Sequence, residues 1–405
     1  MPTPDKPGSQ DEFAIFASQL QRPIEEKVHD FQRHGRLKHL IFGAQLKPEL
    51  LEKLFRMANM IRRMARERES NLELKRLLAH KRAMLYFTQP STRTFLSFMA
   101  ACQLLGITCN EVRDAKTSSE AKRESQMDSI RMFSSYFDVI MMRSPLANLA
   151  ECCGYLMNRL ESQEMRSVPT INAGSGKDEH PTQALLDMYT IHRTFDFDMG
   201  QRKGDLRFKQ LRKKYPDISP GAEKKTYLFC GDIGRGRTVR SLATVLSQYQ
   251  QQRMFFVAPD HDVLRLGDDL KQTLENANVE VHQFQSLDDE IDGLPILAEA
   301  DCVYMTRIQR EHNAPQTSDE IGKIDLSQFQ LSFDRLAKMK EYAPIMHPFP
   351  RDSVVNEIPV EVDVDPRVMY FRQARNGMWA RAALLVHLLD AADELFIVYG
   401  DRFQA

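Results

Sequence analysis

Short apolar segments alternate with amphipathic ones along most of this chain, and that alternation limits the folds open to it. RAMLYF (82–87), DVIMMR (138–143) and TYLFCGDI (226–233) are typical of buried strands, and helical patterns separate them. Further strands are expected at 107–112, 168–174, 253–259, 279–284, 302–306 and 343–350. Buried strands joined by helices predict parallel sheets covered on both faces. The expected fold class is α/β, with two doubly wound parallel-sheet domains linked by helices.

Length and local composition set the expected organisation. A chain of 405 residues is longer than one hydrophobic core usually serves, so two domains are expected. The first 40 residues begin Pro-rich and polar and then become charged, as in an extension ahead of the first domain. The segment near 196–225 is basic and turn-rich, which indicates a surface insertion, and 374–395 predicts one strong amphipathic helix.

Charge and cysteine content exclude several classes of function. The formal net charge is -1, from 55 Lys+Arg and 56 Asp+Glu, which gives no global reason to expect a nucleic acid or a membrane as partner. No apolar stretch is long enough to span a bilayer, and the first residues lack the order of a signal peptide. The six cysteines form no C-x-x-C pair. We therefore expect reduced, buried thiols and a cytoplasmic protein.

Polar motifs follow six of the expected strands. Ser91–Thr94 follows the first strand, and corresponding positions after other strands hold Arg143, His180, Arg237, Arg307 and Pro348. Ligands of open α/β sheets bind beyond the carboxyl ends of the strands. The six motifs are therefore expected to share one cleft.

The Ser-Thr-Arg-Thr cluster at 91–94 stands where a strand gives way to a helix. A helix N-terminus offers free N–H groups and a partial positive charge, so the hydroxyls and Arg93 suit a phosphate. The alternative is an ordinary Ser/Thr cap beside a solvated arginine. Both interpretations remain open from this stretch alone.

The other motifs also allow two interpretations each. Arg143 is a ligand clamp or a surface residue, and His180 is a hydrogen-bond donor to a substrate oxygen or a structural histidine. Arg307 and Gln309 alternate on one side of an extended segment, as two donors or as a solvated strand end. HPFP (347–350) is a rigid turn that aims a carbonyl group, in which an X-Pro bond can be cis, or a plain loop.

Several chemistries find no support in the sequence. GDIGRGRT (231–238) is not G-x-G-x-x-G, and arginines stand where a dinucleotide turn needs bare backbone. No metal-ligand spacing and no nucleophile motif is present. Arginine, histidine, hydroxyl and amide groups remain, which bind a phosphorylated dianion and a polycarboxylate and stabilise an oxyanion. They predict direct group transfer from an acyl phosphate, with no metal and no cofactor.

The ordered set S-T-R-T, M-R-S-P, H-P-T-Q, G-R-T, T-R-I-Q and H-P-F-P-R resembles the aspartate/ornithine carbamoyltransferase family, over roughly 45–398. T-R-I-Q and H-P-F-P-R resemble the corresponding motifs of the catalytic chain in the aspartate branch of this family. The resemblance implies a carbamoyl-phosphate domain, an aspartate domain and a C-terminal helix returning to the first. The boundaries expected on this basis are an extension at 1–44 and segments at 45–180, 181–375 and 376–405.

The resemblance also implies roles for residues. Catalysis would fall to Arg93, Thr94, Lys122, Arg143 and His180. Carbamoyl phosphate would bind to Ser91, Thr92, Arg93, Thr94, Ser118, Lys122, Arg143, His180, Gln183 and Pro348. Aspartate would bind to Lys122, Arg237, Arg307, Gln309, Pro348 and Phe349. The catalytic unit would be a homotrimer with sites shared between subunits, and Phe349–Pro350 would be a cis bond.

Some positions depart from the family pattern. Glu120, Ala121 and Arg123 replace the usual glycine-containing surroundings of the loop lysine, within 117–124. Gln89 and His312 stand where glutamate and arginine are often found. These changes, the extension and the insertion leave domain closure, regulatory chains and larger assemblies open.

The expected reaction is carbamoyl transfer from carbamoyl phosphate to the amine of L-aspartate, an early step of pyrimidine synthesis. One alternative is a transcarbamylase with a different amino-acid acceptor. Arg237 and Arg307 argue against ornithine, because two arginines suit two carboxylates. The other alternative is a non-catalytic homologue that serves as an assembly scaffold, although the catalytic-type positions are complete.

Overall fold

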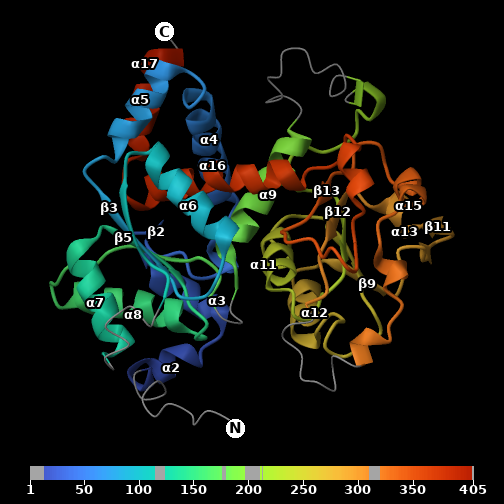
Figure 1. Ribbon diagram of the computed structural model, residues 1–405, viewed down its shortest axis with the longest axis horizontal. Helices are drawn as coiled ribbons and strands as arrows, with labels where there is room; N and C mark the ends of the chain where they lie inside the picture. The colour runs from blue at the N-terminus through green and yellow to red at the C-terminus, as the bar shows by residue number, and fades with distance from the viewer. Residues whose placement is uncertain are drawn as a thin grey trace. The chain divides into compact units, whose positions relative to one another are not determined.

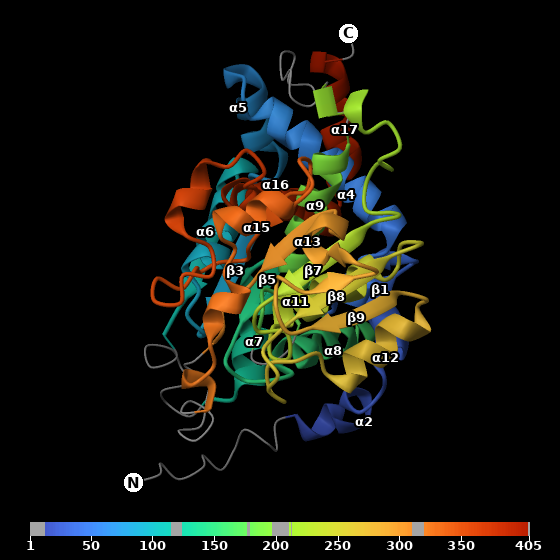
Figure 2. The ribbon, with the colours of Figure 1, turned by 90° about the vertical axis from the view of Figure 1, so that its right-hand side faces the viewer.

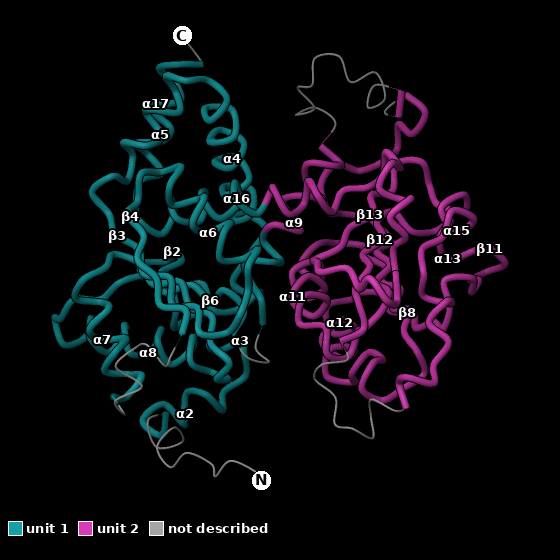
Figure 3. Tube along the Cα trace, viewed as in Figure 1, with its two compact units in different colours: residues 1–185, 377–405 teal, residues 186–376 magenta. Residues whose placement is uncertain are grey.

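The structure is a computed structural model, and it describes residues 13–114, 124–175, 179–196, 210–211, 213–309 and 320–403. The chain divides into two compact units (Figure 3). Unit 1 comprises 1–185 and 377–405, and unit 2 comprises 186–376. Each unit is built on its own parallel sheet, so the predicted α/β fold class with two parallel-sheet domains is confirmed.

Unit 1 has a four-stranded sheet in the order β4-β3-β5-β6. The strands are β3 (Arg82–Phe87), β4 (Thr108–Val112), β5 (Val139–Arg143) and β6 (Thr170–Asn172), and every pair is parallel. β5 is buried along its whole length, as its apolar sequence predicts. In the register of β3 and β5, Phe87 lies opposite Arg143, so the two loops that follow these strands start side by side.

Helices cover this sheet. They are α4 (Pro48–Met64), α5 (Arg68–Leu77), α6 (Thr92–Leu104), α7 (Gln126–Tyr136), α8 (Leu149–Ser162), most of α16 (Tyr370–Leu388) and α17 (Ala392–Phe403). α17 packs on α4 and α5 (Figure 1), where the Arg402 guanidinium lies 2.9 Å from a Glu69 oxygen. The last helix was predicted as one piece over 374–395, which is wrong. Asp390, at φ 62°, ends α16 and lets α17 start in a new direction.

The segment before α4 is part of the core of unit 1. It contains η1 (Ala14–Phe16), α2 (Ala17–Leu20), α3 (Ile24–Lys27), η2 (Val28–Phe31), β1 (Gln32–Arg33), β2 (Arg36–Leu37) and η3 (Gly43–Gln45). Phe31 is fully buried, and its ring centroid lies 4.9 Å from that of Tyr155 on α8. The buried Lys27 ammonium lies 2.9 Å from the Glu151 carboxylate of the same helix. Apolar contacts and a buried ion pair therefore tie this segment to α8.

Unit 2 has a five-stranded parallel sheet in the order β13-β12-β7-β8-β9. Figure 2 shows β7, β8 and β9 side by side. Its strands are β7 (Thr226–Cys230), β8 (Arg253–Val257), β9 (Glu280–Phe284), β12 (Cys302–Met305) and β13 (Ile345–Met346). β10 (Glu290–Ile291) and β11 (Leu294–Pro295) form a small hairpin.

Helices pack on this sheet too. They are most of α9 (Pro181–Phe195), α11 (Arg237–Leu246), α12 (Asp268–Asn276), α13 (Ile296–Glu299), α15 (Phe333–Lys338), η6 (Leu326–Phe329) and η7 (Val360–Val364). Five of the six cysteines are buried, as expected for thiols in apolar strands and helices. No helix among the described residues is both long and apolar enough to cross a membrane.

Candidate functional site

The Ser91–Thr94 cluster begins α6 directly beyond β3. Ser91 is the N-cap residue, but its side chain makes no capping hydrogen bond. The hydroxyl is therefore not used as an ordinary cap, which favours the phosphate interpretation of the cluster. Thr92 and Arg93 are exposed, whereas Thr94 is buried. The Gln89 N–H donates to the Arg143 carbonyl at 3.1 Å, which joins this loop to the end of β5.

Arg143 and His180 meet around Gly174. A Cβ atom built on Gly174 would lie 2.8 Å from Nη1 of Arg143 and 2.9 Å from Nε2 of His180. Gly174 also has φ 96°, a conformation that favours glycine. Absence of a side chain at this position thus lets the guanidinium and the imidazole approach the same point. Both are buried, at 8% and 4% exposure, so this Arg143 is no surface residue.

Asn172 holds the turn that brings these groups together. Its Oδ1 accepts hydrogen bonds from the N–H groups of Gly174 (2.9 Å) and Ser175 (3.0 Å). Its Nδ2 donates to the carbonyls of Ile41 (3.1 Å) and Glu179 (3.2 Å). The buried amide thus uses its donors and acceptor on both sides of the turn, and it fixes the path from β6 towards His180.

His180 stands at the start of α9. The N–H groups of Gln183 and Ala184 donate to its carbonyl, at 2.9 and 3.2 Å. Gln183 lies in the first turn of the helix and is 8% exposed. Unit 1 therefore places Thr94, Arg143, His180 and Gln183, all buried polar residues, at or after the carboxyl ends of neighbouring strands. Buried donors in this position suit a polar ligand.

In unit 2 a buried carboxylate organises the predicted acceptor side. Asp232, in the loop after β7, has no exposed surface. Its Oδ2 accepts hydrogen bonds from Nη2 of Arg235 at 2.7 Å and from the N–H of Gln309 at 3.1 Å. Asp232 thus pairs with Arg235 and joins the loop after β7 to the segment after β12, where Arg307 and Gln309 lie.

The contact between these two loops is close. The Asp232 N–H donates to Oγ1 of Thr306 at 3.1 Å. A Cβ atom on Gly231, at φ 120°, would lie 2.1 Å from the carbonyl oxygen of Thr306. Arg237 is the first residue of α11, on the same loop as Asp232. The two predicted carboxylate-binding segments therefore start from adjacent strands and touch each other.

Pro348 and Phe349 follow β13, the edge strand beside β12. The Phe349–Pro350 bond is cis, which confirms the prediction drawn from the resemblance. The Phe349 ring lies against Tyr370 and Phe371, with both centroid distances 5.7 Å. The HPFP segment is thus a packed turn and not a plain loop.

Ser118, Lys122 and His312 lie outside the described residues, as do residues 197–209 and 212 of the insertion near 196–225. That the unit 1 residues and the unit 2 residues face one cleft stays a prediction. Among the residues that the structure does describe, no group of three His, Cys, Asp or Glu side chains could hold a metal ion.

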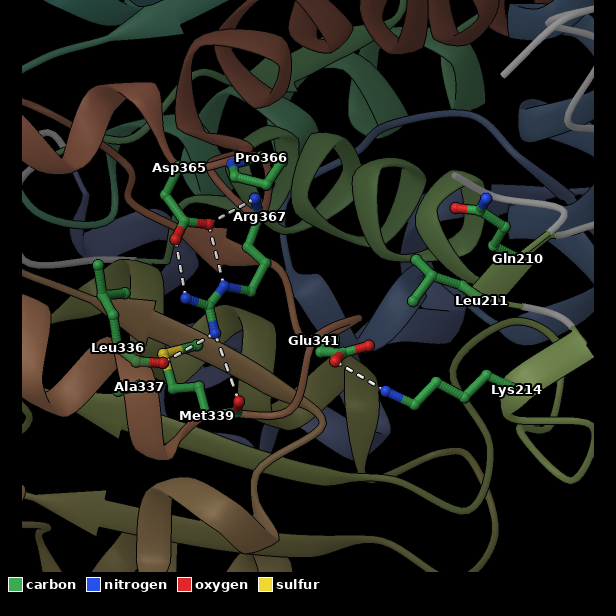
Figure 4. A pocket seen from close by; sticks show the side chains of 10 residues that line it. All are labelled: Gln210, Leu211, Lys214, Leu336, Ala337, Met339, Glu341, Asp365, Pro366 and Arg367. Atoms are coloured by element: carbon green, nitrogen blue, oxygen red, sulfur yellow. Dashed lines mark hydrogen bonds and ion pairs between the residues drawn. The ribbon is translucent and has the colours of Figure 1, made fainter. Parts of the chain in front are cut away.

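One pocket in unit 2 is separate from the predicted site residues (Figure 4). It is lined by Gln210, Leu211, Lys214, Leu336, Ala337, Met339, Glu341, Asp365, Pro366 and Arg367. Its charged groups pair with one another, because Lys214 lies 2.7 Å from Glu341 and Arg367 lies 2.8 Å from Asp365. Because these ion pairs neutralise the charged groups that line the pocket, it attracts a charged substrate only weakly, and it is not our candidate site.

Sequence reasoning missed the buried polar residues whose hydrogen bonds hold the loops of the site in place. They are Asn172, Asp187, Asp232, His347, Glu357 and Gln373, all buried. A carboxylate or amide inside an apolar strand–helix stretch was the available signal, since buried polar groups require partners. Asp187 within ALLDMYT is the clearest case.

Family models match two parts of the chain. Residues 38–193 match the model described as aspartate/ornithine carbamoyltransferase, carbamoyl-P binding domain. Residues 223–388 match the model of the Asp/Orn binding domain of the same family. The segment before residue 38 and the segment 194–222 lie outside both matches.

Individual relatives agree with this assignment. The chain is 35% identical over 357 residues to the aspartate carbamoyltransferase catalytic subunit of Clostridium perfringens, covering 88% of this chain and 99% of that protein. It is 35% identical over 356 residues to the chloroplastic aspartate carbamoyltransferase of Arabidopsis thaliana, covering 87% and 78%.

Solved structures are similar as well. The catalytic subunit of the M. jannaschii aspartate transcarbamoylase has a TM-score of 0.68 and 30% identity, covering 87% of this chain and 98% of that one. The Trypanosoma cruzi aspartate transcarbamoylase, in complex with carbamoyl phosphate and aspartate, has a TM-score of 0.67 and 30% identity, covering 86% and 95%. The chain described here therefore belongs to the aspartate/ornithine carbamoyltransferase family.

Proposed function

We propose that this chain transfers the carbamoyl group of carbamoyl phosphate to the amine of L-aspartate, giving N-carbamoyl-L-aspartate and phosphate. The observation that carries the proposal is the convergence of the buried Arg143 and His180 on Gly174. Two fixed donors in a buried site can stabilise negative charge on a carbonyl oxygen without reorganising. That is the charge which develops when an amine attacks a carbamoyl carbon.

The residues of unit 1 would bind the donor substrate. The N-terminus of α6, with Ser91, Thr92 and Arg93, would hold the phosphate, because its N–H groups and the guanidinium favour a dianion. Arg143, His180 and Thr94 would polarise the carbamoyl carbonyl. Gln183 and the Pro348 region would contact the carbamoyl group and the amine.

The residues of unit 2 would bind the acceptor. Arg237 and Arg307 would each hold one carboxylate of aspartate, with Gln309 beside them. Asp232 supports this arrangement, since it fixes the main chain at Gln309 and pairs with Arg235, the neighbouring guanidinium. The amine nitrogen would attack the carbamoyl carbon and form the C–N bond. The C–O bond to the phosphate would break, and the departing phosphate would take up the proton that the amine loses.

The proposal extends to the assembly and the location of the enzyme. The catalytic unit would be a homotrimer, in which the loop carrying Ser118 and Lys122 reaches the site of a neighbouring subunit. The partners to test for are a regulatory subunit and further copies of the trimer in a larger assembly. The reaction would run in the cytoplasm, as an early step of pyrimidine synthesis, and it would require no metal and no cofactor.

A steady-state assay of the purified chain tests the proposal. Carbamoyl phosphate is offered with L-aspartate, L-ornithine and other amino acids in parallel, and the ureido product is detected. Turnover with aspartate alone is the expected result. Turnover with another amine would move the chain to a different acceptor. A folded sample that binds carbamoyl phosphate and turns over no amine would favour the scaffold alternative.

A further inference from the structure

Hydrogen bonds of one buried histidine, His347, hold the turn at Pro348–Phe349 in place. The His347 N–H donates to Oε1 of Gln373 at 2.9 Å, and the Phe349 N–H donates to Nδ1 of His347 at 2.8 Å. Because Nδ1 accepts a hydrogen bond, the proton of a neutral ring lies on Nε2. Nε2 is 3.0 Å from Oε1 of Glu357, where it donates to the carboxylate. His347 is 1% exposed, so water does not compete for these bonds.

Gln373 is itself held by a carboxylate. Its Nε2 donates to Oδ1 of Asp187 at 2.6 Å, and the Tyr304 hydroxyl donates to Oδ2 of Asp187 at 2.8 Å. Asp187 has no exposed surface and Gln373 is 1% exposed. Burial and the neighbouring Asp187 carboxylate raise the pKa of Tyr304 well above its ordinary value, so the hydroxyl stays a donor. The carboxylate thus decides which way the Gln373 amide points, with its oxygen towards His347.

The turn needs this support because its backbone is unusual. Phe349 has φ 59°, which is rare for a residue with a bulky side chain. Such a conformation persists where surrounding contacts over-determine it. Here they are the His347 bond and the rings of Tyr370 and Phe371.

We propose that Asp187 is a positioning residue for the reaction, which acts through Gln373 and His347 to fix the main chain of Pro348–Phe349 where the acceptor binds. The inference rests on the proposed function. Asp187 lies at the far end of a chain of hydrogen bonds from the turn, so its effect on the substrate passes through the orientation of one amide.

The test exchanges donor and acceptor at the Asp187–Gln373 contact. Gln373→Glu keeps an acceptor for the His347 N–H but sets two carboxylates against each other. Two buried carboxylates in contact either repel each other or must take up a proton, so the Nε2 donor that oriented the side chain at 373 is lost. At pH 8 we expect kcat/KM for aspartate to fall by about 30-fold, because the turn loses its fixed position.

The double variant Asp187→Asn with Gln373→Glu should rescue activity. The amide introduced at 187 can donate to the carboxylate at 373 and still accept from Tyr304, and the net charge of the pair is unchanged. We expect kcat/KM to return to within about threefold of the parent protein.

The two helices that carry Asp187 and Gln373, α9 and α16, offer a matched control one turn further along. Asn376 Nδ2 donates to Oγ1 of Thr190 at 3.0 Å, and both residues are buried. Thr190→Val removes that bond between α9 and α16 without changing the side chains that hold the turn. We expect a loss of stability with kcat/KM for aspartate within about threefold of the parent.

Each outcome decides the inference. Loss in Gln373→Glu, rescue in the double variant and near-normal kcat/KM in Thr190→Val support it. A folded double variant as impaired as the single one would overturn it, as would an equal loss in Thr190→Val. If Gln373→Glu does not fold, the double variant decides alone: near-parental kcat/KM supports the exchange, and failure to fold or to turn over refutes it. A parent chain inactive with aspartate removes the proposed function and the inference together.

Discussion

Gly174→Ala should disable catalysis more than it destabilises the fold. The new methyl group would lie 2.7 Å from Cδ2 of His180 and 2.8 Å from Nη1 of Arg143, closer than atoms in contact can come. The guanidinium or the imidazole must move away. Loss of one fixed donor to a developing oxyanion typically lowers kcat by about 10²- to 10³-fold, and we expect a loss in that range.

The change has a second, separable cost. An alanine at φ 96° is strained, by about 1–2 kcal/mol of unfolding free energy. Gly35→Ala supplies the control, because Gly35 has φ 74° and nothing within 4 Å of its Cβ position. That variant should lose a similar amount of stability and keep its kcat.

Both variants are measured in the ureido assay at saturating carbamoyl phosphate and aspartate, and in urea unfolding. The comparison separates backbone strain from displacement of the two donors. A Gly174→Ala protein with kcat within about threefold of the parent would refute the reasoning, because it would mean that the approach of Arg143 and His180 to Gly174 is not used in the reaction.

Three other outcomes are expected. Burial lowers the pKa of His39 to about 3 and that of His387 to about 4, so both histidines are neutral in the folded protein. Below about pH 6.5 the unfolded chain therefore binds more protons than the folded one. The free energy of unfolding should keep its full value above that pH and fall by about 2 kcal/mol per histidine by pH 5. Urea unfolding at pH 8, 6 and 5 measures it, and a flat profile would contradict it. Phe31→Ala, at a fully buried position of the segment before α4, should cost about 3–5 kcal/mol, whereas a loss below about 1 kcal/mol in the same measurement would mean that this segment is not part of the core. Arg93→Ala should abolish most turnover and leave the unfolding curve unchanged, since the side chain is exposed; near-normal activity would remove the role in phosphate binding.

Local pattern predicted much of this molecule. The strands predicted over 82–87, 138–143 and 226–233 were recognisable because nearly all of their residues are buried, and the phosphate-type motif was recognisable because a hydroxyl cluster follows the first of them. The resemblance then supplied the residues that converge from separate strands, such as Arg143 and His180. Their approach to Gly174 depends on the turn that Asn172 holds, and the hydrophobic periodicity of the sequence does not predict that turn.

The failures have physical causes too. Asp187 and Gln373 are 186 residues apart, and only tertiary structure makes each the partner of the other. The sequence of the segment before α4 is mostly polar and charged, yet Phe31 and a few other apolar residues are enough to pack it on α8. The break at Asp390 was missed because the amphipathic pattern continues through it, while a single residue in a left-handed conformation redirects the chain.

The return of residues 377–405 to unit 1 has a consequence for how the chain is made. Unit 2 is one continuous segment, 186–376, and all of it is synthesised before residues 377–405. Unit 1 has no such independence, because α17 packs on α4 and α5, which are synthesised more than 300 residues earlier. Its N-terminal part therefore has an incomplete core until residues 377–405 have been added, so unit 2 is expected to complete its core first.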